Sequence, residues 1–429
     1  MVRVTSMLML LGVLTACQQE APTERSAPAP AVSSAIAYTN ANIWDGTGSP
    51  LLRNATLVVD GGRVAAVSND DVPEGATIVD LNGAYVIPGL INTHGHVTSS
   101  WAPASVLEPQ SRVLEGLRLY ARYGVTTVLS LGGAPDEAFA LRQSFNPEDP
   151  GHARFYLAGP VVADRTAADA RAQAMANVER GVDWLKLRVD DNLGRAEKMP
   201  WEAVEAVFDV SRETDVPVAT HIFYRSDAAR LIDLGSAMIA HSVRDLPVDD
   251  AFISSLDMAG VCYVPTLTRE VSTFVYAEPP GFFDDPFFQR HANAEQLARV
   301  SDPEFQSAMA SSESAAGYRV ALRQAMENLG RMTDAGAAIA FGTDSGPPGR
   351  FPGYFEHLEL EMMVEAGMTP EQALASATGE AANCVGLTDV GTLEPGKWAD
   401  FLVLEDDPTV DISATKSLQR VFLAGRELR

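Results

Sequence analysis

The chain has 429 residues, of which 46% are hydrophobic and 21% are charged, as in an ordinary globular protein. Its 57 acidic and 32 basic residues give a formal net charge of −25, which argues against a nucleic-acid partner because little would neutralise phosphates. Three cysteines are too few, and odd in number, for a disulfide scaffold. The length allows one large domain and a smaller one.

The first 17 residues have the pattern of a secretory signal. Arg3 precedes an apolar run from Met7 to Val13 that is too short to span a bilayer, and the sequence LTAC ends at Cys17. LTAC resembles the bacterial lipobox, whose cysteine becomes the lipidated first residue of the mature protein; ordinary signal cleavage is the alternative. Gln18, in place of Asp, resembles outer-membrane lipoproteins. We therefore expect a protein on the periplasmic side of the outer membrane, in contact with it only through lipidated Cys17.

The next two segments differ sharply in composition. Residues 18–34 are rich in Pro, Ala and Ser, which predicts a disordered tether. Residues 35–88 show short alternating strands separated by turns, with a hairpin signal at Asp60–Gly62. The second segment therefore predicts the N-terminal part of a small β domain.

From residue 89 onward, short apolar runs alternate with helical patterns, which predicts repeating βα units around a parallel sheet. The apolar runs are LINTHGHV, VTTVLSLG, RFYLAGPVV, VDWLKLRV, VPVATHIF, SAMIAHSV, VCYVPTL and AIAFGTDSG. Eight units predict a TIM barrel, with a doubly wound sheet as the alternative.

The end of the chain returns to strand patterns. We expect residues 389–429 to join residues 35–88 in one small β domain that the barrel interrupts in sequence. The predicted fold is thus α/β: a (β/α)8 TIM barrel over residues 89–388, with a small discontinuous β-sandwich domain built from N- and C-terminal strands.

Ionisable residues gather at one end of the predicted barrel. The C-terminal ends of the strands carry the chemistry in this fold. Four of the chain's seven histidines, one lysine and one aspartate fall there: His94, His96, Lys186, His221, His241 and Asp344. Alternate residues of a strand point to one face, so His94 and His96 point together. Imidazole and carboxylate are zinc ligands, and we expect a metal site.

The pattern leaves room for two ions. His94, His96 and Asp344 would hold one, whereas His221 and His241 need a further ligand for a second. Lys186 lies between Leu185 and Leu187, and burial there would favour its free amine. A free amine reacts with carbon dioxide to give a carbamate, an anionic bridging ligand. The alternative is a surface lysine at a strand end.

This layout resembles the amidohydrolase superfamily, and within it the prolidase-like and imidazolonepropionase-like branch of secreted bacterial enzymes. The matching segments are VIPGLINTHGHV, VDWLKLRV, ATHIF, IAHSV, FGTDSG and GTLEPGKWADFLVLE, and they keep the family order. The resemblance implies His94, His96 and Asp344 on one divalent ion, expected to be zinc, and His221 and His241 on a second. It implies carboxylated Lys186 as the bridge. Imidazolonepropionase uses one metal without this lysine, so Lys186 favours the binuclear, prolidase-like group.

The expected reaction follows from such a site. A water between two ions ionises near neutral pH, and Asp344 would take its proton as general base and pass it to the leaving nitrogen as general acid. The predicted substrate is a small amide or peptide, of the Xaa-Pro-like dipeptide or N-acyl amino acid type. A lactonase or phosphotriester hydrolase on the same site is the alternative, since both use the same chemistry. A deaminase and a non-catalytic binding lipoprotein are less favoured.

Three further residues are candidates for substrate binding. Tyr224 resembles a family position that contacts the substrate, and Arg188 and Arg350 could bind a carboxylate. The long segment of residues 268–300 is either a lid or a piece packed against the barrel rim. A homo-oligomer is compatible with the sequence, which predicts no particular oligomeric state.

Overall fold

The structure, a computed structural model, describes residues 35–69, 72–103 and 105–428. The predicted signal peptide with Cys17 and the predicted tether lie outside the described residues. The chain divides into Met1–Ser33 and a second unit, Ser34–Arg429. Among the described helices, none combines the length and the apolar character needed to cross a membrane.

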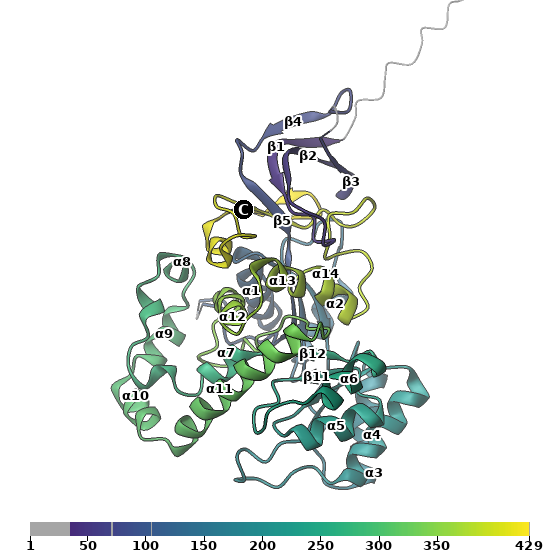
Figure 1. Cartoon of the computed structure of the whole chain (residues 1–429), viewed down its shortest axis with the longest axis vertical. Coiled ribbons are helices and arrows are strands. Elements are labelled where there is room, and N and C mark those ends of the chain that lie inside the picture. Colours follow the sequence, from purple (N-terminus) through teal and green to yellow (C-terminus); the bar gives the residue numbers. More distant parts are fainter. Residues whose placement is uncertain (1–34, 70–71, 104, 429) are drawn as a thin grey trace, which may run out of the picture. The chain divides into compact units, whose positions relative to one another are not determined.

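One sheet joins strands from early and late in the chain, drawn in purple and yellow in Figure 1. Its order is β15-β14-β13-β5-β1-β2-β3, and β4 pairs with β1. The strands are β1 (Ile36–Ile43), β2 (Leu52–Asp60), β3 (Arg63–Ser68), β4 (Thr77–Asp80), β5 (Tyr85–Pro88), β13 (Phe401–Leu404), β14 (Leu418–Leu423) and β15 (Arg426–Glu427). β13 is antiparallel to β5, with Leu402 opposite Ile87. This pairing confirms that strands from both ends of the chain build the small β domain.

Aromatic rings hold these distant strands together. The ring of Tyr38 on β1 lies 5.1 Å from that of Phe401 and 5.2 Å from that of Phe422, between centroids. Phe401 and Phe422 stack on each other at 4.2 Å, and all three side chains are buried. Such aromatic contacts add about 0.5–1.5 kcal/mol per pair beyond the burial of apolar area.

Seven parallel strands form most of the barrel. They are β6 (Leu90–Gly95), β7 (Val125–Ser130), β8 (Arg154–Leu157), β9 (Leu185–Arg188), β10 (Val218–His221), β11 (Met238–Ala240) and β12 (Cys262–Val264). They pair in the orders β6-β7-β8 and β9-β10-β11-β12. A parallel bridge between Ala158 and Trp184 continues the ring from β8 towards β9.

The eighth strand of the barrel is irregular. The segment predicted as AIAFGTDSG contains no regular strand, but Ile339 forms a parallel bridge with Tyr263, and Ser345 forms one with Gly95. These two bridges close the ring between β12 and β6, and the TIM barrel is thus confirmed. The backbone departs from a strand near Asp344, whose φ of 57° is left-handed.

Helices alternate with the strands as predicted. They are α1 (Pro109–Arg122), α2 (Asp136–Gln143), α3 (Ala167–Glu179), α4 (Trp201–Thr214), α5 (Arg225–Leu234), α6 (Asp250–Ala259), α11 (Glu313–Asp334) and α12 (Tyr354–Glu365), followed by α13 (Pro370–Ser376) and α14 (Gly379–Cys384). Side chains cap several N-termini, as where Asp249 accepts from the backbone of Phe252. Gly260 ends α6 in the left-handed conformation that glycine tolerates.

The segment between β12 and α11 is built from short helices. They are α7 (Leu267–Val271), η1 (Val275–Ala277), η2 (Gly281–Asp284), α8 (Pro286–Gln289), α9 (Ala294–Val300) and α10 (Pro303–Ala310). The buried ring of Phe288 lies 5.0 Å from those of Phe351 and Tyr354, and Tyr123, the C-cap residue of α1, donates a hydrogen bond to the carbonyl of Phe288. These contacts favour packing against the barrel rim over a free lid.

A disulfide joins the barrel to α14. Cys262 on β12 is bonded to Cys384, with Cα atoms 5.7 Å apart and a sequence separation of 122. This pair could not be predicted from the sequence, because the number of cysteines alone does not show which thiols meet.

Candidate metal centre

The first and eighth strand positions bring three predicted ligands together. His96 Nε2 lies 2.6 Å from Asp344 Oδ1, and His94 Nε2 lies 3.6 Å from the same oxygen. Asn92 accepts a hydrogen bond from the backbone N–H of His94, and the N–H of Asp344 donates to the carbonyl of His94 at 2.6 Å. The fold therefore fixes His94 and Asp344 against each other through the main chain.

Two of the predicted ligands have an unusual backbone. His241 has a φ of 73° and Asp344 a φ of 57°, both in the left-handed region. Non-glycine residues rarely adopt this region, and strain of this kind clusters at functional sites. His241 directly follows β11, and Asp344 lies in the irregular eighth segment of the barrel.

The fifth and sixth strands supply the other two histidines. The ring of His241 lies 4.1 Å from that of His221 and 4.7 Å from that of His94, between centroids. His241 Nδ1 is 2.8 Å from the hydroxyl of Thr266, and His221 Nε2 is 2.9 Å from Asp190 Oδ2. Hydrogen bonds of this type fix the orientation of an imidazole and leave its other nitrogen for a ligand.

Lys186 is buried within the same group. Its side chain comes from β9, it is 3% exposed, and its Nζ has no hydrogen-bond partner. Burial lowers its pKa from 10.5 to about 7, because the ammonium form loses its hydration, and Asp344 opposes this shift. Burial thus favours the free amine of Lys186, as predicted from its apolar neighbours.

The ionisation states suit metal binding. Burial lowers the pKa values of His94 and His241 well below 6.5, and neighbouring positive charges add to the shift, so both imidazoles are neutral. Burial alone would raise the pKa of Asp344, but the charge of Arg350 and the hydrogen bond from His96 hold it well below 3.8. Neutral imidazole and ionised carboxylate are the forms that ligate a metal.

The donor set fits a divalent metal ion. Ligand atoms of His94, His241 and Asp344 all lie within 4.8 Å of one another. Nδ1 of buried His94 has no hydrogen-bond partner, like Nζ of Lys186. Among the described residues, this group combines His94 and Asp344, predicted to hold one ion, with His241, predicted to hold the other. Nitrogen and oxygen donors of this kind suit zinc and related transition metals.

The predicted substrate-binding residues have protein partners in this structure. Arg350 forms an ion pair with Asp344 and also donates to Ser272 Oγ at 3.0 Å. The hydroxyl of Tyr224, at the N-cap of α5, donates to the Asp191 carboxylate at 2.9 Å. The structure thus places Arg350 beside Asp344 and Tyr224 beside Asp191.

Arg188 also has a partner of its own. Its guanidinium hydrogen-bonds to Asn192 and lies 3.6 Å from Asp190 Oδ2, with more than a third of the side chain exposed. It therefore lies near the Asp190–His221 pair rather than against the His94–Asp344 group.

Several charged residues at this face of the barrel were not predicted from the sequence. Asp190 follows β9, Arg244 follows β11, and Arg269 and Glu270 follow β12. All four are buried. These residues follow barrel strands, as the predicted histidines do. Acids and arginines are so common in loops, however, that this position alone does not distinguish them.

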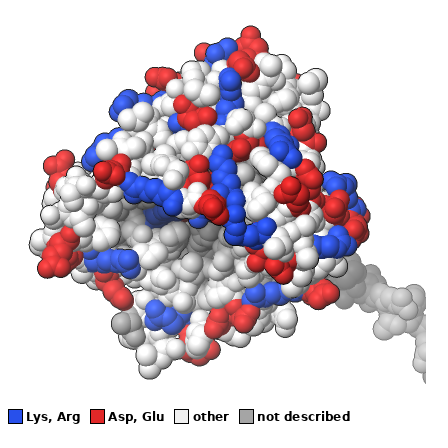
Figure 2. Space-filling view, turned by 90° about the horizontal axis from the view of Figure 1, so that it is seen from below, with Lys and Arg blue, Asp and Glu red and all other residues white. Residues whose placement is uncertain are grey.

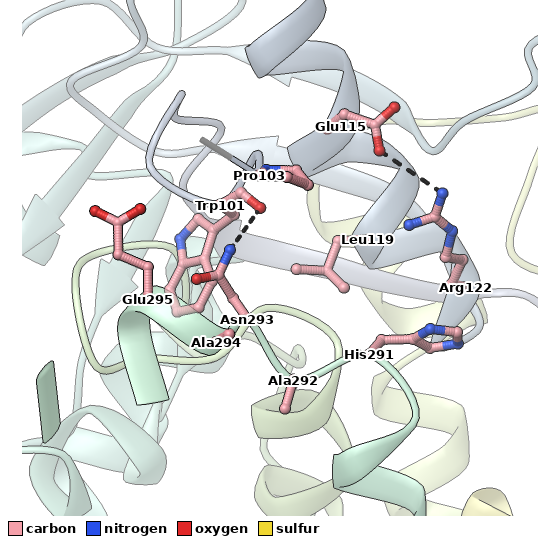
Figure 3. Close-up of a pocket in the computed structure, with 10 residues that line it drawn as sticks. All are labelled: Trp101, Pro103, Glu115, Leu119, Arg122, His291, Ala292, Asn293, Ala294 and Glu295. Carbon is pink, nitrogen blue, oxygen red and sulfur yellow. Dashed lines mark hydrogen bonds and ion pairs between the residues drawn. The ribbon is translucent and has the colours of Figure 1, made fainter. Parts of the chain in front are cut away.

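Other hollows of the molecule lie apart from this group. Figure 2 shows acidic and basic side chains interspersed over one face, which is hollowed near its centre. A pocket of about 410 Å³ lies between α1 and the segment around α9, and Figure 3 shows its lining residues. None of the six predicted metal ligands lines it. Trp101 lines this pocket, and its indole N–H donates a hydrogen bond to the carbonyl of Gly346, two residues after Asp344.

Comparison with known proteins agrees with this geometry. The model of the amidohydrolase family matches residues 85–428, so the chain belongs to that family. An imidazolonepropionase from Deinococcus radiodurans is 27% identical over 409 residues, covering 88% of this chain and 93% of the relative. An imidazolonepropionase from Streptomyces avermitilis is 26% identical over 408 residues, covering 90% of each chain.

Solved structures show the same fold. A candidate prolidase from Bifidobacterium longum superposes with a TM-score of 0.73 at 25% identity, covering 92% of this chain and 95% of the other. An Xaa-Pro dipeptidase with methionine bound in its active site superposes with a TM-score of 0.71 at 21% identity, covering 92% and 99%. Family membership and the His–Asp centre together make the chain a metal-dependent hydrolase that acts on carbon–nitrogen bonds.

Proposed function

We propose that the chain is a binuclear metal-dependent amidohydrolase that cleaves the amide bond of an Xaa-Pro-like dipeptide or an N-acyl amino acid. The observation that carries the proposal is Lys186, whose buried amine has no partner and lies among the histidines and Asp344. A buried lysine without a counterion is costly unless it is neutral or modified. Its carbamate would supply the anionic ligand that His221 and His241 lack.

The residues of the chain divide the work as follows. His94, His96 and Asp344 would hold one ion and His221 and His241 the other, with carboxylated Lys186 between them. Divalent ions in this place, zinc in the first instance, would polarise the substrate carbonyl and lower the pKa of a water.

Asp344 is the proton carrier of the proposed reaction. Its carboxylate is ionised and fixed by His96 and Arg350, so it can accept a proton and return it to the leaving nitrogen. Arg350 acts on Asp344 by position and charge, because its guanidinium bonds to one carboxylate oxygen while His96 bonds to the other.

The likeness to known enzymes supports an amide substrate. The curated relatives act on imidazolonepropionate by name, and solved neighbours include prolidases and an Xaa-Pro dipeptidase. All these names describe cleavage of a carbon–nitrogen bond. A lactonase or phosphotriester hydrolase is a competing outcome of the test below.

The test combines metal analysis with a substrate panel. Purified protein should contain about two divalent ions per chain and should hydrolyse dipeptides or N-acyl amino acids faster than lactones or organophosphates. Lys186→Met should lower the metal content and reduce kcat/KM on the order of 100-fold or more. Lys397→Met, in the small β domain, is the matched control. Fewer than one ion per chain together with no amidase activity would overturn the proposal.

We also propose that the protein is anchored through Cys17 on the periplasmic side of the outer membrane. The Cys262–Cys384 disulfide supports an oxidising compartment, where such bonds form and persist. Cys17→Ala should shift the protein from the membrane fraction to the soluble fraction of fractionated cells. An unchanged membrane fraction would contradict lipid anchoring.

A further inference from the structure

Three buried charged residues lie beside the metal centre and take no part in the mechanism above. Arg244 lies three residues after His241, and Arg269 and Glu270 lie on α7, directly after β12. Their side chains are 0%, 9% and 0% exposed, respectively. Arginines are rarely buried without a pairing reason.

Hydrogen bonds place these residues next to the metal ligands. Thr266, just before α7, bonds to His241, and Thr268 on α7 donates to the carbonyl of Thr343, next to Asp344. Arg269 follows Thr268 in the same short helix. The turn that carries Arg269 is therefore tied to both the sixth and the eighth strand positions of the barrel.

The group holds two cations and one anion. Arg269 Nη1 donates to Glu270 Oε2 at 2.9 Å, and Arg244 Nε lies 3.3 Å from Glu270 Oε1. An arginine does not lose its proton in a protein. Two further carboxylates act on the group, Asp190 on Arg244 and Asp344 on Arg269. Both also have hydrogen-bond partners of their own, Asp190 in His221 and Asp344 in His96 and Arg350.

The group has open hydrogen-bonding capacity. Arg244 Nη2 is buried without a hydrogen-bond partner, and Arg244 Nε and Glu270 Oε1 face each other as an ion pair at 3.3 Å without forming a hydrogen bond. Arg269 Nη2 has only a long contact of 3.4 Å to the hydroxyl of Tyr318. Buried polar groups in native proteins are normally satisfied, so open groups beside a reaction centre indicate a missing polar ligand.

Aromatic rings hold both guanidinium planes. Arg269 lies over the ring of Tyr318 at 4.6 Å, and Arg244 lies over the ring of Phe223 at 4.7 Å. Stacking of this kind fixes the plane and leaves the edge of the guanidinium free for a planar anion. Arg269 is the less deeply buried of the two, with 9% of its side chain exposed against 0% for Arg244, so a ligand would reach Arg269 first.

We propose that Arg269 binds a carboxylate of the substrate, and that Glu270 and Arg244 are positioning residues that hold its guanidinium. The inference rests on the proposed amidohydrolase function and narrows it. The substrate would be an N-acyl amino acid or a dipeptide whose free α-carboxylate lies next to the scissile amide. A neutral lactone or phosphotriester offers no group for this arginine.

The first test compares two forms of one substrate. Wild-type enzyme and Arg269→Met are assayed on an N-acyl amino acid and on its methyl ester. For the free acid, the variant should lose on the order of 100-fold in kcat/KM, mainly through KM, whereas the ester should change by less than about 3-fold. For the free acid, Arg269→Lys should have a kcat/KM between those of wild type and Arg269→Met, because lysine keeps the positive charge but cannot donate two parallel hydrogen bonds. Arg331→Met, an exposed position on α11, is the matched control.

The second test measures binding without turnover. Calorimetry on the metal-loaded protein ranks the common L-amino acids as product-like ligands, and the tightest is compared with its amino alcohol, which lacks the carboxylate. Arg269→Met should weaken the amino acid on the order of 100-fold and leave the alcohol nearly unchanged. Glu270→Gln should reduce the same preference in part.

The outcomes separate this proposal from the general one. If wild-type protein cleaves no amide but Arg269→Met abolishes the carboxylate preference in binding, only the proposed reaction fails. The inference is overturned if Arg269→Met lowers kcat/KM equally for the acid and the ester, or lowers the affinity equally for the amino acid and the alcohol. Arg269 would then have a structural role only. It is also overturned if no amino acid binds the wild-type protein.

Discussion

Two groups of buried polar side chains flank the first and eighth strand positions of the barrel, and they differ in how completely they are hydrogen-bonded. On one side, Glu356 on α12 accepts from Asn92 at 2.5 Å and from Ser345 at 2.6 Å. It also accepts from Thr343 Oγ1 and from the backbone of Gly353. Although it is 0% exposed, this carboxylate has several donors around it.

On the other side, buried groups lack partners. His94 Nδ1 and Lys186 Nζ have none, and Arg244 has two open nitrogens. Glu359, one turn after Glu356, belongs to the saturated side and accepts three hydrogen bonds from the start of α7.

The contrast separates structural from functional polar groups. A saturated carboxylate such as Glu356 fixes the strands that carry His94 and Asp344, because its donors come from both. Open groups are the ones available to metal and substrate. Substitutions on the open side should therefore affect activity more than stability, and those on the saturated side should do the reverse.

The largest effect is expected for Asp344→Asn on the open side. The amide cannot carry the proton and is a weaker ligand, so kcat/KM should fall about 1000-fold while the free energy of unfolding changes far less. Steady-state kinetics and urea unfolding measure the two quantities. Asp257→Asn, an exposed position on α6, is the control. A variant that keeps activity would remove Asp344 from the mechanism.

On the saturated side, Glu356→Gln should destabilise the fold by about 3–5 kcal/mol. The new amide group would face donors that need an acceptor, and a buried charged network would be broken. Urea unfolding of metal-loaded protein measures the loss, with Glu365→Gln, an exposed position on the same helix, as control. If stability is unchanged but activity falls, Glu356 belongs to the functional side and the comparison fails.

Glu359 should make stability depend on pH. Burial raises its pKa from 4.5 to about 7, and the hydrogen bonds from Thr268 and Leu267 reduce this shift. Between these values the folded state holds a proton that the unfolded state has lost. The contribution of Glu359 to the free energy of unfolding is therefore fully present below pH 4.5. It falls by about 3 kcal/mol as the pH rises through 7.

Glu359→Gln serves as the non-titrating reference for this effect. The difference in unfolding free energy between wild type and variant should decline from pH 4.5 to pH 7. A difference that is flat or increases with pH would show that the carboxylate is ionised throughout.

The smallest effect is expected for Trp101→Phe, at the wall of the pocket in Figure 3. The variant loses the indole hydrogen bond of 2.6 Å to the carbonyl of Gly346. A loss of about 1 kcal/mol in stability is expected, with kcat changed by less than about 3-fold. Trp201→Phe at the start of α4 is the control. A large fall in kcat would connect this pocket to the Asp344 loop.

Much of the architecture could be predicted from local pattern. Apolar runs alternating with helical periods predicted the βα repeats, and position after a strand singled out His94, His221 and His241, because side-chain direction in a strand is a local property. Lys186 could be predicted as a buried amine from its two leucine neighbours alone.

Other features depended on contacts between residues far apart in the chain. The Cys262–Cys384 bond closes over 122 residues, and Glu359 meets Leu267 across 92. The pairing of Arg269 with Glu270 is local, but the open nitrogen of Arg244 beside Glu270 is evident only in the folded structure.

The repeating units and the donor atoms of the centre could thus be predicted from local patterns, because strand and helix periodicity is set by neighbouring residues. Which buried polar groups are saturated and which are open became evident only in the folded chain, because the hydrogen bonding of a buried group depends on every element that packs around it.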